Sequence, residues 1–264
     1  MSIDTHLFDY IKAAALLGGN MILEALGTKN QLPADQKSSH ADIITETDLM
    51  VDSRIRDFLT KLCPRIQINS EESTENRQNE ELIIVDPIDG TLNYSHGINE
   101  IAVSIGYWRA DTPIIGVVYN PIQNLLYSAQ KGKGAFRNGI PIRVSDTESI
   151  RKSMLSSGWP YDKAAVVDAG LLMGKMTLEC QEVRVLGSAA LAVCKVADGS
   201  LDGYWEAGLF PWDLAGAVVV LNEAGGVYSS YDGSDFKLAS GEIIATNGVI
   251  HHEVVDKLKN EGLN

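Results

Sequence analysis

An apolar segment that ends in two carboxylates sets the strongest constraint on how this chain can fold. Residues 84–94 read IVDPIDGTLNY, so Asp86 and Asp89 stand three residues apart, with Pro87 between them and Gly90 directly behind. The apolar run predicts a buried strand. A carboxylate at the buried end of a strand is costly unless it is paired or bound to a cation. The fold must therefore supply a partner for these acids.

The first half of the chain predicts two helices followed by one sheet. Apolar residues recur at three- and four-residue intervals over 3–26, and a second helix is predicted from about 47 to 62. Between them, the polar segment 27–41 predicts a mobile surface loop. Short apolar or alternating runs bounded by turn residues then predict strands at 82–85, 101–108, 113–119 and 125–129.

The second half alternates between strands and helices. Asn138-Gly139 predicts a tight hairpin turn, and Gly132-Lys133-Gly134 a simple turn. Strands are expected at 154–157, 183–185 and 203–205, and helices at 162–178, 189–198 and 213–223. This alternation is typical of an α/β layer. We therefore expect an α/β (α+β) protein with two sheets, forming one compact unit, 1–264, from an α+β half, 1–144, and an α/β half, 145–264.

Composition narrows the class of protein. The 264 residues carry a formal net charge of −13, which argues against binding nucleic acid because that binding relies on clustered Lys and Arg. The cysteines Cys63, Cys180 and Cys194 are scattered and show no CxxC spacing, which favours a reducing, cytoplasmic setting. No apolar stretch approaches the ~20 residues of a membrane span, so no membrane association is expected.

Acidic residues stand at three further places. Glu71-Glu72 follow the alternating run 66–69, Asp48 follows Ile43-Ile44, and Asp213 lies between Trp212 and an apolar helix. Simple structural roles exist for each of them: Asp48 and Asp213 suit the first turn of a helix, and Glu71-Glu72 suit a solvated loop. Asp89-Gly90 suits a turn.

Taken together, the acids describe a metal site. Oxygen ligands without a His or Cys cluster favour magnesium or a similar ion. Asp86 and Asp89, three apart across a turn, can face two adjacent cations, an arrangement that suits hydrolysis of a phosphate ester. Gly90 lets the backbone approach a phosphate, and the Thr91 hydroxyl can hold the attacking water. An aspartyl-phosphate mechanism stays open, although its acids stand two apart rather than three with Pro87 between.

The motifs resemble those of one known family. Asp86-Pro87-Ile88-Asp89-Gly90-Thr91, with Glu71-Glu72-Ser73 before it and Trp212-Asp213-Leu214-Ala215-Gly216-Ala217 and Glu223-Ala224-Gly225-Gly226 after it, is similar to the inositol monophosphatase family. These are magnesium-dependent, lithium-sensitive phosphatases. The resemblance implies a layered αβαβα sugar-phosphatase fold and a homodimer. It also implies hydrolysis of inositol monophosphate by a metal-activated water, with two or three Mg²⁺ per active site.

The resemblance also implies roles for single residues. Glu71, Asp86 and the Ile88 carbonyl match ligands of the first metal; Asp86, Asp89 and Asp213 match those of the second; Glu71 would hold a third through water. Asp48 and Thr91, with Glu71, match the catalytic residues that orient and deprotonate the water. The amides of Gly90 and Thr91 match the phosphate site, and Asp89, Gly187, Ser188, Ala189 and Glu206 line the substrate pocket. Lys37 lies on the matching mobile loop.

Two kinds of alternative remain. Relatives with the same chemistry act on 3′-phosphoadenosine 5′-phosphate, fructose-1,6-bisphosphate or histidinol phosphate. Glu206 and the short spacer 207–211 favour inositol, because a carboxylate suits several hydroxyls and repels a second phosphate. The other kind is a non-catalytic, metal-gated regulatory protein. Most aromatic residues near these motifs are expected to pack as core or near-site hydrophobes: Trp159, Tyr161, Trp205 and Trp212.

Overall fold

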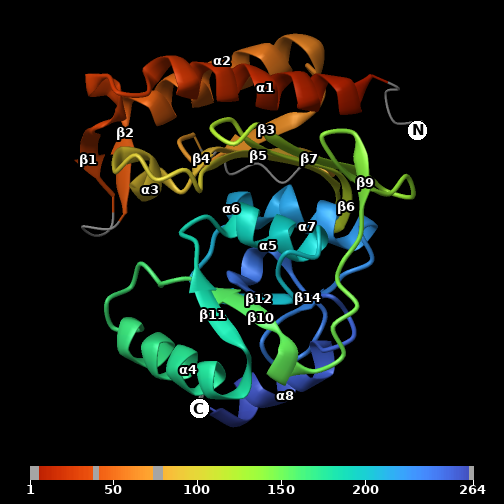
Figure 1. Ribbon diagram of the computed structural model, residues 1–264. Coiled ribbons are helices and arrows are strands. Elements are labelled where there is room, and N and C mark those ends of the chain that lie inside the picture. Colours follow the sequence, from red (N-terminus) through yellow and green to blue (C-terminus); the bar gives the residue numbers. More distant parts are fainter. Residues whose placement is uncertain (1–5, 38–41, 74–79, 262–264) are drawn as a thin grey trace.

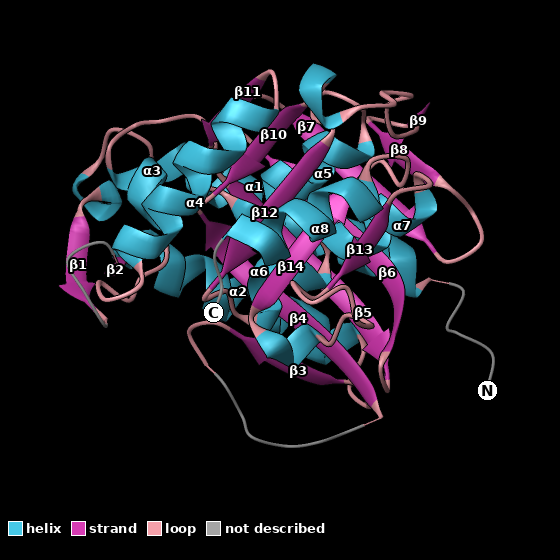
Figure 2. Cartoon of the chain, turned by 90° about the horizontal axis from the view of Figure 1, so that it is seen from below, coloured by secondary structure: helices cyan, strands magenta, loops and turns pink. Residues whose placement is uncertain are grey.

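Five layers of helices and sheets make up the molecule (Figure 1). The computed structural model describes residues 6–37, 42–73 and 80–261. Helices α1 (Leu7–Ala25) and α2 (Glu46–Leu62) cover the outer face of a seven-stranded sheet. Three helices fill the space between the two sheets, namely α5 (Ala189–Ala197), α6 (Pro211–Ala215) and α7 (Ala217–Glu223). Helices α4 (Val166–Glu179) and α8 (His251–Glu261) cover the outer face of the five-stranded sheet, as Figure 2 shows from below. The expected layered αβαβα fold is confirmed.

The larger sheet is mainly antiparallel. Its strand order is β3-β4-β5-β6-β7-β8-β9, with only β3 and β4 parallel. The strands are β3 (Gln67–Ser70), β4 (Glu81–Asp89), β5 (Ala102–Arg109), β6 (Thr112–Asn120), β7 (Leu125–Gln130), β8 (Ala135–Arg137) and β9 (Ile140–Ile142). The predicted tight turn joins β8 to β9, where Asn138 and Gly139 both have positive φ angles, 51° and 77°.

The smaller sheet mixes parallel and antiparallel pairs. Its order is β11-β10-β12-β14-β13, in which β10 runs parallel to β11 and β12 while β14 is antiparallel to both of its neighbours. The strands are β10 (Met154–Ser157), β11 (Glu182–Val185), β12 (Gly203–Ala207), β13 (Val227–Ser229) and β14 (Glu242–Thr246). Short elements complete the described chain: α3 (Thr91–Ser95) and the 3₁₀ turns Lys29–Gln31, Ile150–Lys152 and Leu238–Ser240.

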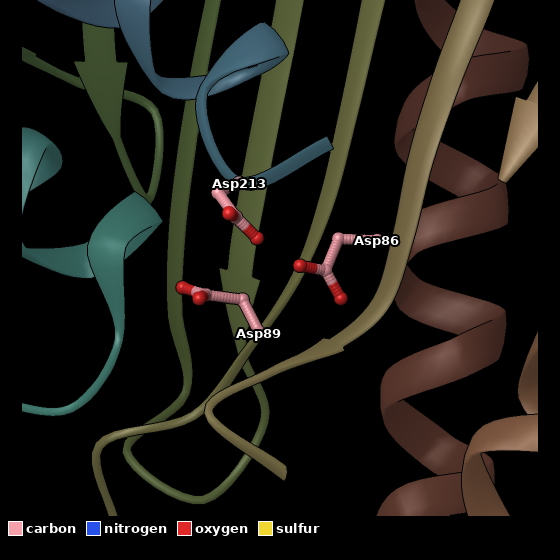
Figure 3. Close-up of side chains that lie close together, drawn as sticks. All are labelled: Asp86, Asp89 and Asp213. Atoms are coloured by element: carbon pink, nitrogen blue, oxygen red, sulfur yellow. The ribbon is translucent and has the colours of Figure 1, made fainter. Parts of the chain in front are cut away.

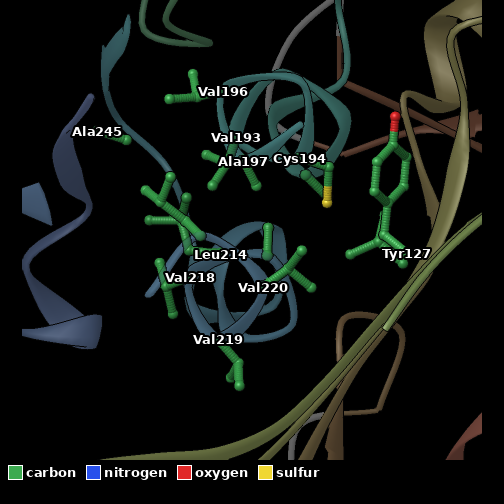
Figure 4. Packing of buried hydrophobic residues seen from close by; sticks show 14 of the residues in the cluster. Tyr127, Val193, Cys194, Val196, Ala197, Leu214, Val218, Val219, Val220 and Ala245 are labelled. Carbon is green, nitrogen blue, oxygen red and sulfur yellow. The ribbon is translucent and has the colours of Figure 1, made fainter. Parts of the chain in front are cut away.

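Strand β4 is apolar on both faces because both faces are covered. Ile83 and Val85 pack with α1 and α2, whereas Ile84 packs with the central helices. Figure 4 shows the central layer, in which Val193 of α5 and Val218 of α7 belong to one buried cluster. Each fully buried side chain of this kind stabilises the fold by roughly 1.5–3 kcal/mol.

Glycines on the large sheet let the central helices approach the strands closely. A Cβ on Gly106 would lie 2.4 Å from the carbonyl oxygen of Ala215, and one on Gly116 would lie 2.1 Å from that of Gly216. The structure divides the helix predicted over 213–223 into two, α6 and α7, which are separated at Gly216. This break places Asp213 in the first turn of α6, at the end of the strands.

Some predicted boundaries were wrong. The predicted loop 27–41 contains β1 (Pro33–Gln36), which pairs antiparallel with β2 (Ile43–Thr45), because exposed polar residues can form an edge strand when a partner lies alongside. Its residues 38–41 lie outside the described part. The helix predicted from residue 162 begins at Val166, after a turn over 162–165. Of the first predicted helix, residues 3–5 lie outside the described part and residue 26 follows the end of α1.

The backbone amides of the turn at 132–134 bind the side chain of Glu223. The amides of Gly132, Lys133 and Gly134 donate to the carboxylate of Glu223 at 2.9, 3.1 and 2.9 Å. The turn prediction is confirmed, and this contact fastens the end of α7 to the sheet. Across the described ranges, no helix combines the length and apolarity needed to span a bilayer.

Candidate active site

Three carboxylates converge where β4 ends and α6 begins (Figure 3). One oxygen from each of Asp86, Asp89 and Asp213 lies within 4.8 Å of the others. Strand β4 is irregular here: Asp86 pairs with Ser104 and Asp89 with Ala102, so three residues of β4 span two of β5. Pro87 has no N–H for the ladder, which favours a bulge at this point. The bulge turns both carboxylates of β4 toward α6.

This centre concentrates negative charge in a buried place. Asp86 is 1% exposed and Asp89 is 6% exposed. Burial raises the pKa of Asp86 well above its usual value, and the charges of Glu71, Asp89 and Asp213 raise it further. Burial followed by the charge of Asp89 raises the pKa of Asp213 in the same way. Within the described residues, Asp86 Oδ1 has no hydrogen-bond partner. A buried oxygen without a donor, beside two more carboxylates, fits a divalent cation with oxygen ligands.

Asp89 is anchored by the start of α5. The Ser188 hydroxyl and the Ala190 amide donate to its Oδ2, the latter at 2.9 Å, and the Ala189 amide donates to Oδ1 at 3.2 Å. Burial raises the pKa of Asp89 to about 6, with the Ser188 hydrogen bond opposing that shift. Ser188 and Ala189 therefore fix one carboxylate of the centre.

Asp48 and Thr91 form a hydrogen-bonded pair next to the centre. Asp48 Oδ2 accepts hydrogen bonds from the backbone and hydroxyl of Thr45 in a capping box of α2, while Oδ1 accepts from the Thr91 hydroxyl at 3.0 Å. Burial raises the pKa of Asp48 to about 6. The Thr91 hydroxyl also lies 3.0 Å from the Ile88 carbonyl oxygen. One hydroxyl proton serves one acceptor well, so the Ile88 carbonyl is open to another ligand when Thr91 donates to Asp48.

Lys37 reaches the acidic centre from the β1–β2 ribbon. Its Nζ lies 2.7 Å from Glu71 Oε1 and 2.6 Å from Glu72 Oε1. Burial opposes the charge of Lys37, but the two glutamates outweigh it and raise its pKa. Burial raises the pKa of Glu71, and Lys37 partly offsets that effect. The predicted contribution of Lys37 thus has a geometric basis, an ion pair with two acids of the site.

Backbone contacts assemble the region expected to hold the substrate. Gly90 has φ +92°, and a Cβ there would lie 2.9 Å from the Glu100 carbonyl oxygen and 3.0 Å from that of Gly187. These two glycines therefore meet backbone to backbone. Glu206 accepts a hydrogen bond from the Tyr204 hydroxyl. Burial, together with the charge of Asp89, raises the pKa of Glu206 to about 8, and the Tyr204 hydrogen bond opposes that shift.

The sequence did not predict Asn93, Phe210 or Tyr161 as residues of the site. Asn93 Nδ2 donates to the carbonyl oxygens of Glu100 and Leu186, both at 2.8 Å, and so holds the turn before Gly187. The Phe210 amide donates to Asp213 Oδ2 at 2.7 Å. Tyr161, expected only as packing, has its pKa raised by burial and then by the charges of Asp213 and Glu71. Tyr161 is therefore within range of these charges, and no spacing in the sequence indicates this.

Comparison with known proteins agrees with this arrangement. Residues 5–263 match the model of the inositol monophosphatase family. A protein of Synechocystis sp. named inositol-1-monophosphatase is 40% identical over 93% of this chain and 86% of its own length. A Nus factor SuhB of Pasteurella multocida is 32% identical over 93% of both chains. An inositol monophosphatase structure from Anabaena (Nostoc) sp. superposes with a TM-score of 0.87 at 35% identity, covering 97% of this chain and 96% of its own.

The layered fold and the carboxylate centre define a phosphatase of the metal-dependent class. The family match covers nearly the whole chain, and relatives at 32–40% identity align over nine-tenths of it. The chain therefore belongs to the inositol monophosphatase family.

Proposed function

We propose that this protein is a Mg²⁺-dependent phosphomonoesterase that hydrolyses inositol monophosphate to inositol and phosphate. The observation that carries the proposal is the convergence of Asp86, Asp89 and Asp213 beside the Asp48–Thr91 pair. Such a centre holds cations and a water nucleophile next to one another. Inositol monophosphatases among the relatives and neighbours support the substrate.

The residues present suit two or three Mg²⁺ ions. Glu71, Asp86 and the Ile88 carbonyl would hold the first; Asp86, Asp89 and Asp213 the second; Glu71, through water, a weaker third. The unpartnered Asp86 Oδ1 is consistent with a bridging role. When bound, such ions lower the pKa of water and offset charge on the phosphate. Lithium sensitivity is part of this proposal.

The protein's own groups would supply proton transfer and positioning. Thr91 donates to Asp48, which leaves the hydroxyl oxygen to accept a hydrogen bond from a water. Asp48 is then placed to accept that water's proton by way of the Thr91 hydroxyl. Glu71 completes the catalytic set, the amides of Gly90 and Thr91 hold the phosphate, and Ser188 keeps Asp89 in place.

The alcohol would lie toward Gly187, Ala189 and Glu206. Glu206 accepts a hydrogen bond from the Tyr204 hydroxyl, and a carboxylate has further acceptor capacity for ring hydroxyls. An ionised Glu206 carboxylate would repel a second phosphate. This favours a polyol monophosphate over a bisphosphate.

A panel of substrates tests the proposal. Phosphate release with Mg²⁺ would be measured for inositol 1-phosphate, 3′-phosphoadenosine 5′-phosphate, fructose-1,6-bisphosphate and histidinol phosphate. We expect inositol 1-phosphate to have the highest kcat/KM. A higher value for another ester would change the substrate, and no turnover of any ester would remove the enzymatic function. Acid-stable phosphate trapped on Asp86 would contradict direct attack by water.

A regulatory function is the second candidate, because the SuhB relative is named a Nus factor. A purely non-catalytic protein would be free to lose Asp48, Thr91 or Asp213, and all are present with their hydrogen bonds. Full retention of these bonds favours catalysis.

Three features of organisation belong to the same proposal. Residues 1–264 would act as one catalytic unit, which the central core supports because Ile84 and Val118 of the first half pack there with Val193 and Val218 of the second. A homodimer is proposed, to be tested by sedimentation equilibrium. A cytoplasmic setting is proposed because Cys180 and Cys194 are free thiols.

A further inference from the structure

A buried serine lies directly beside Asp86. Ser104 is on β5 and stands opposite Asp86 of β4 in the register of the sheet. It is 0% exposed, and its hydroxyl has no hydrogen-bond partner among the described residues. Burying a polar group without a partner destabilises a fold. Such a group in a folded protein calls for an explanation, and an ion that binds nearby is one.

The serine and the acid point to the same side of the sheet. Side chains alternate between the two faces of a strand. Val103 and Ile105, on either side of Ser104, pack with α1 and α2, so Ser104 faces the central layer. Asp86 faces the same way, because it stands two residues after Ile84, which packs with the central helices. The two side chains therefore lie next to each other between the sheet and α6.

The Ser104 hydroxyl is within reach of the carboxylate. The Cβ atoms of residues directly opposite one another in an antiparallel pair are about 4.5–5.5 Å apart, and hydroxyl side chains form hydrogen bonds across such pairs. Asp86 Oδ1 is also buried, and it too has no partner in the part of the chain that the structure describes. Neighbouring side chains thus offer one donor and one acceptor that suit each other.

Packing explains why the residue at 104 is small but not why it is polar. A Cβ on Gly216 would lie 2.9 Å from Ser104 Oγ, so a larger side chain at 104 would meet the helix backbone. The carbonyl oxygen of Ala215, close by, already accepts a hydrogen bond from Trp108 Nε1 at 3.0 Å. Alanine would satisfy the packing as well as serine does. The hydroxyl therefore points to a role beyond size.

Carboxylates that ligate a metal are usually hydrogen-bonded themselves, and these outer partners fix the orientation of the ligand. The other two acids of the centre have such donors: a serine hydroxyl holds Asp89, and a backbone amide holds Asp213. Asp86 is the acid proposed to bridge two cations, yet its Oδ1 has no donor within the described ranges. Ser104, on the neighbouring strand, can supply one.

We propose that Ser104 is a positioning residue whose hydroxyl donates a hydrogen bond to Asp86 and holds this carboxylate in the orientation that binds the cations. The inference rests on the proposed function, because it takes the acidic centre as a Mg²⁺ site. It adds a residue that is not itself a cation ligand but on which cation binding depends. Ser104 acts through Asp86 rather than on the phosphate ester.

Ser104→Ala removes the hydroxyl and fits the same space. We expect the dissociation constant of Mg²⁺, measured by calorimetry, to rise about tenfold, the lower end of the range for such outer partners. In chelator the Tm should stay the same or rise, because the variant removes a buried hydroxyl that has no partner among the described residues. A purely structural role would give the opposite combination, a lower Tm in chelator and unchanged Mg²⁺ affinity.

Ser156→Ala is the matched control. Ser156 is also a fully buried strand serine, but it lies in the smaller sheet, and its hydroxyl donates to the Arg184 carbonyl oxygen at 2.9 Å. Its removal should lower the Tm in chelator and leave Mg²⁺ affinity within error. If Ser104→Ala does not fold, Ser104→Cys, which has only a weak S–H donor, replaces it with the same expected rise in the dissociation constant.

Two results would overturn the proposal. One is an unchanged Mg²⁺ affinity in the Ser104 variant. The other is a loss of affinity together with a fall of Tm in chelator as large as that of Ser156→Ala, because this would mean general damage to the sheet.

Phosphate release from inositol 1-phosphate separates this inference from the proposed function. With Ser104→Ala we expect the Mg²⁺ concentration for half-maximal activity to rise while kcat at saturating Mg²⁺ changes little. Weaker Mg²⁺ binding by the variant, without turnover of any ester by the wild type, would support the role of Ser104 and reject the phosphatase. Turnover with equal Mg²⁺ binding by both proteins would leave the phosphatase standing and reject the role of Ser104. Absence of Mg²⁺ binding by the wild type would reject both.

Discussion

Two carboxylates of the site use one oxygen for a helix cap and are also part of a second contact within the site. Asp48 uses Oδ2 for Thr45 and Oδ1 for Thr91. Asp213 uses Oδ2 for the Phe210 amide, and one of its oxygens lies with Asp86 and Asp89. From the sequence alone, helix capping and a role in the site are alternative interpretations of these two residues. In the structure each side chain has both roles. Because a cap fixes the rotamer, it also aims the free oxygen.

Substitution of Asp213 separates these two roles. Asp213→Asn keeps an oxygen for the Phe210 amide but removes the charge, whereas Asp213→Ala removes both. We expect kcat to fall at least about a hundredfold in both variants, as for other groups that stabilise transition-state charge. Without metal, Asp213→Asn should be more stable than the wild type, since like-charge repulsion is relieved. Asp213→Ala should be about 1 kcal/mol less stable than Asp213→Asn, the usual worth of a cap.

Steady-state kinetics and urea unfolding in chelator measure these effects. Asp57→Asn is the matched control, because Asp57 lies exposed on α2. It should leave both quantities within error. Equal stability of the two Asp213 variants would mean that the Phe210 contact contributes nothing to the fold.

The role of the Thr91 hydroxyl can also be tested by substitution. Thr91→Ser keeps the hydroxyl that donates to Asp48, and Thr91→Val keeps the shape without it. We expect the Ser variant to retain kcat within about tenfold and the Val variant to lose about a hundredfold or more, in the range of general-base effects. Metal affinity, measured by calorimetry, should change little in either. Comparable kcat for the two variants would exclude a role for the hydroxyl in orienting water.

Among the elements, the approach of α6 to the large sheet controls where Asp213 lies. A Cβ on Gly106 would meet backbone atoms of Ala215 at 2.4–2.5 Å, and backbone cannot rotate away as a side chain can. We expect Gly106→Ala to lower the free energy of unfolding by roughly 1–3 kcal/mol, as overpacking does. It should also weaken Mg²⁺ binding, because α6 shifts and carries Asp213 with it.

Gly174 on α4 provides the matched comparison. No atom lies within 4 Å of a Cβ built there. Gly174→Ala should therefore stabilise the protein by about 0.5–1 kcal/mol, the helix propensity difference. Thermal unfolding and calorimetric Mg²⁺ titration distinguish the two variants. Unchanged Mg²⁺ affinity in a destabilised Gly106→Ala would show that Asp213 is placed independently of this contact.

Local patterns in the sequence predict the elements better than the places where elements meet. The turn Asn138-Gly139 and the acids of β4 are visible because each depends on a few neighbouring residues. The close approach of Gly216 to the sheet is not visible, since a Cβ there would lie 2.9 Å from the Ser104 hydroxyl oxygen and 3.0 Å from the Ile105 carbonyl oxygen, both on a strand distant in the sequence. The position of Tyr161 is hidden for the same reason. The charges that act on it come from Asp213 on α6, from Glu71 after β3 and from the acids of β4, which only the fold brings together.

For the whole molecule, the buried acids link stability to pH and to metal. Without metal, the folded-state pKa values of Asp48 and Asp89 are raised to about 6 and that of Glu206 to about 8. A raised pKa means that the folded state binds protons more tightly than the unfolded chain does. The stability that comes from this is complete below the unfolded pKa values, near pH 4, and is lost as the pH rises through about 6 and then 8.

We therefore expect the Tm in chelator to fall by several degrees between about pH 5 and pH 8. Saturating Mg²⁺ should remove most of this fall, because a cation bound only to the folded state favours the charged carboxylates and adds its binding free energy. Differential scanning calorimetry across this pH range, with and without Mg²⁺, makes the comparison. Asp86→Asn should show a shallower decline in chelator, since Asp86 is the most crowded of the acids. A Tm that rises with pH in chelator would contradict the prediction that these acids are buried and that their charge is not compensated.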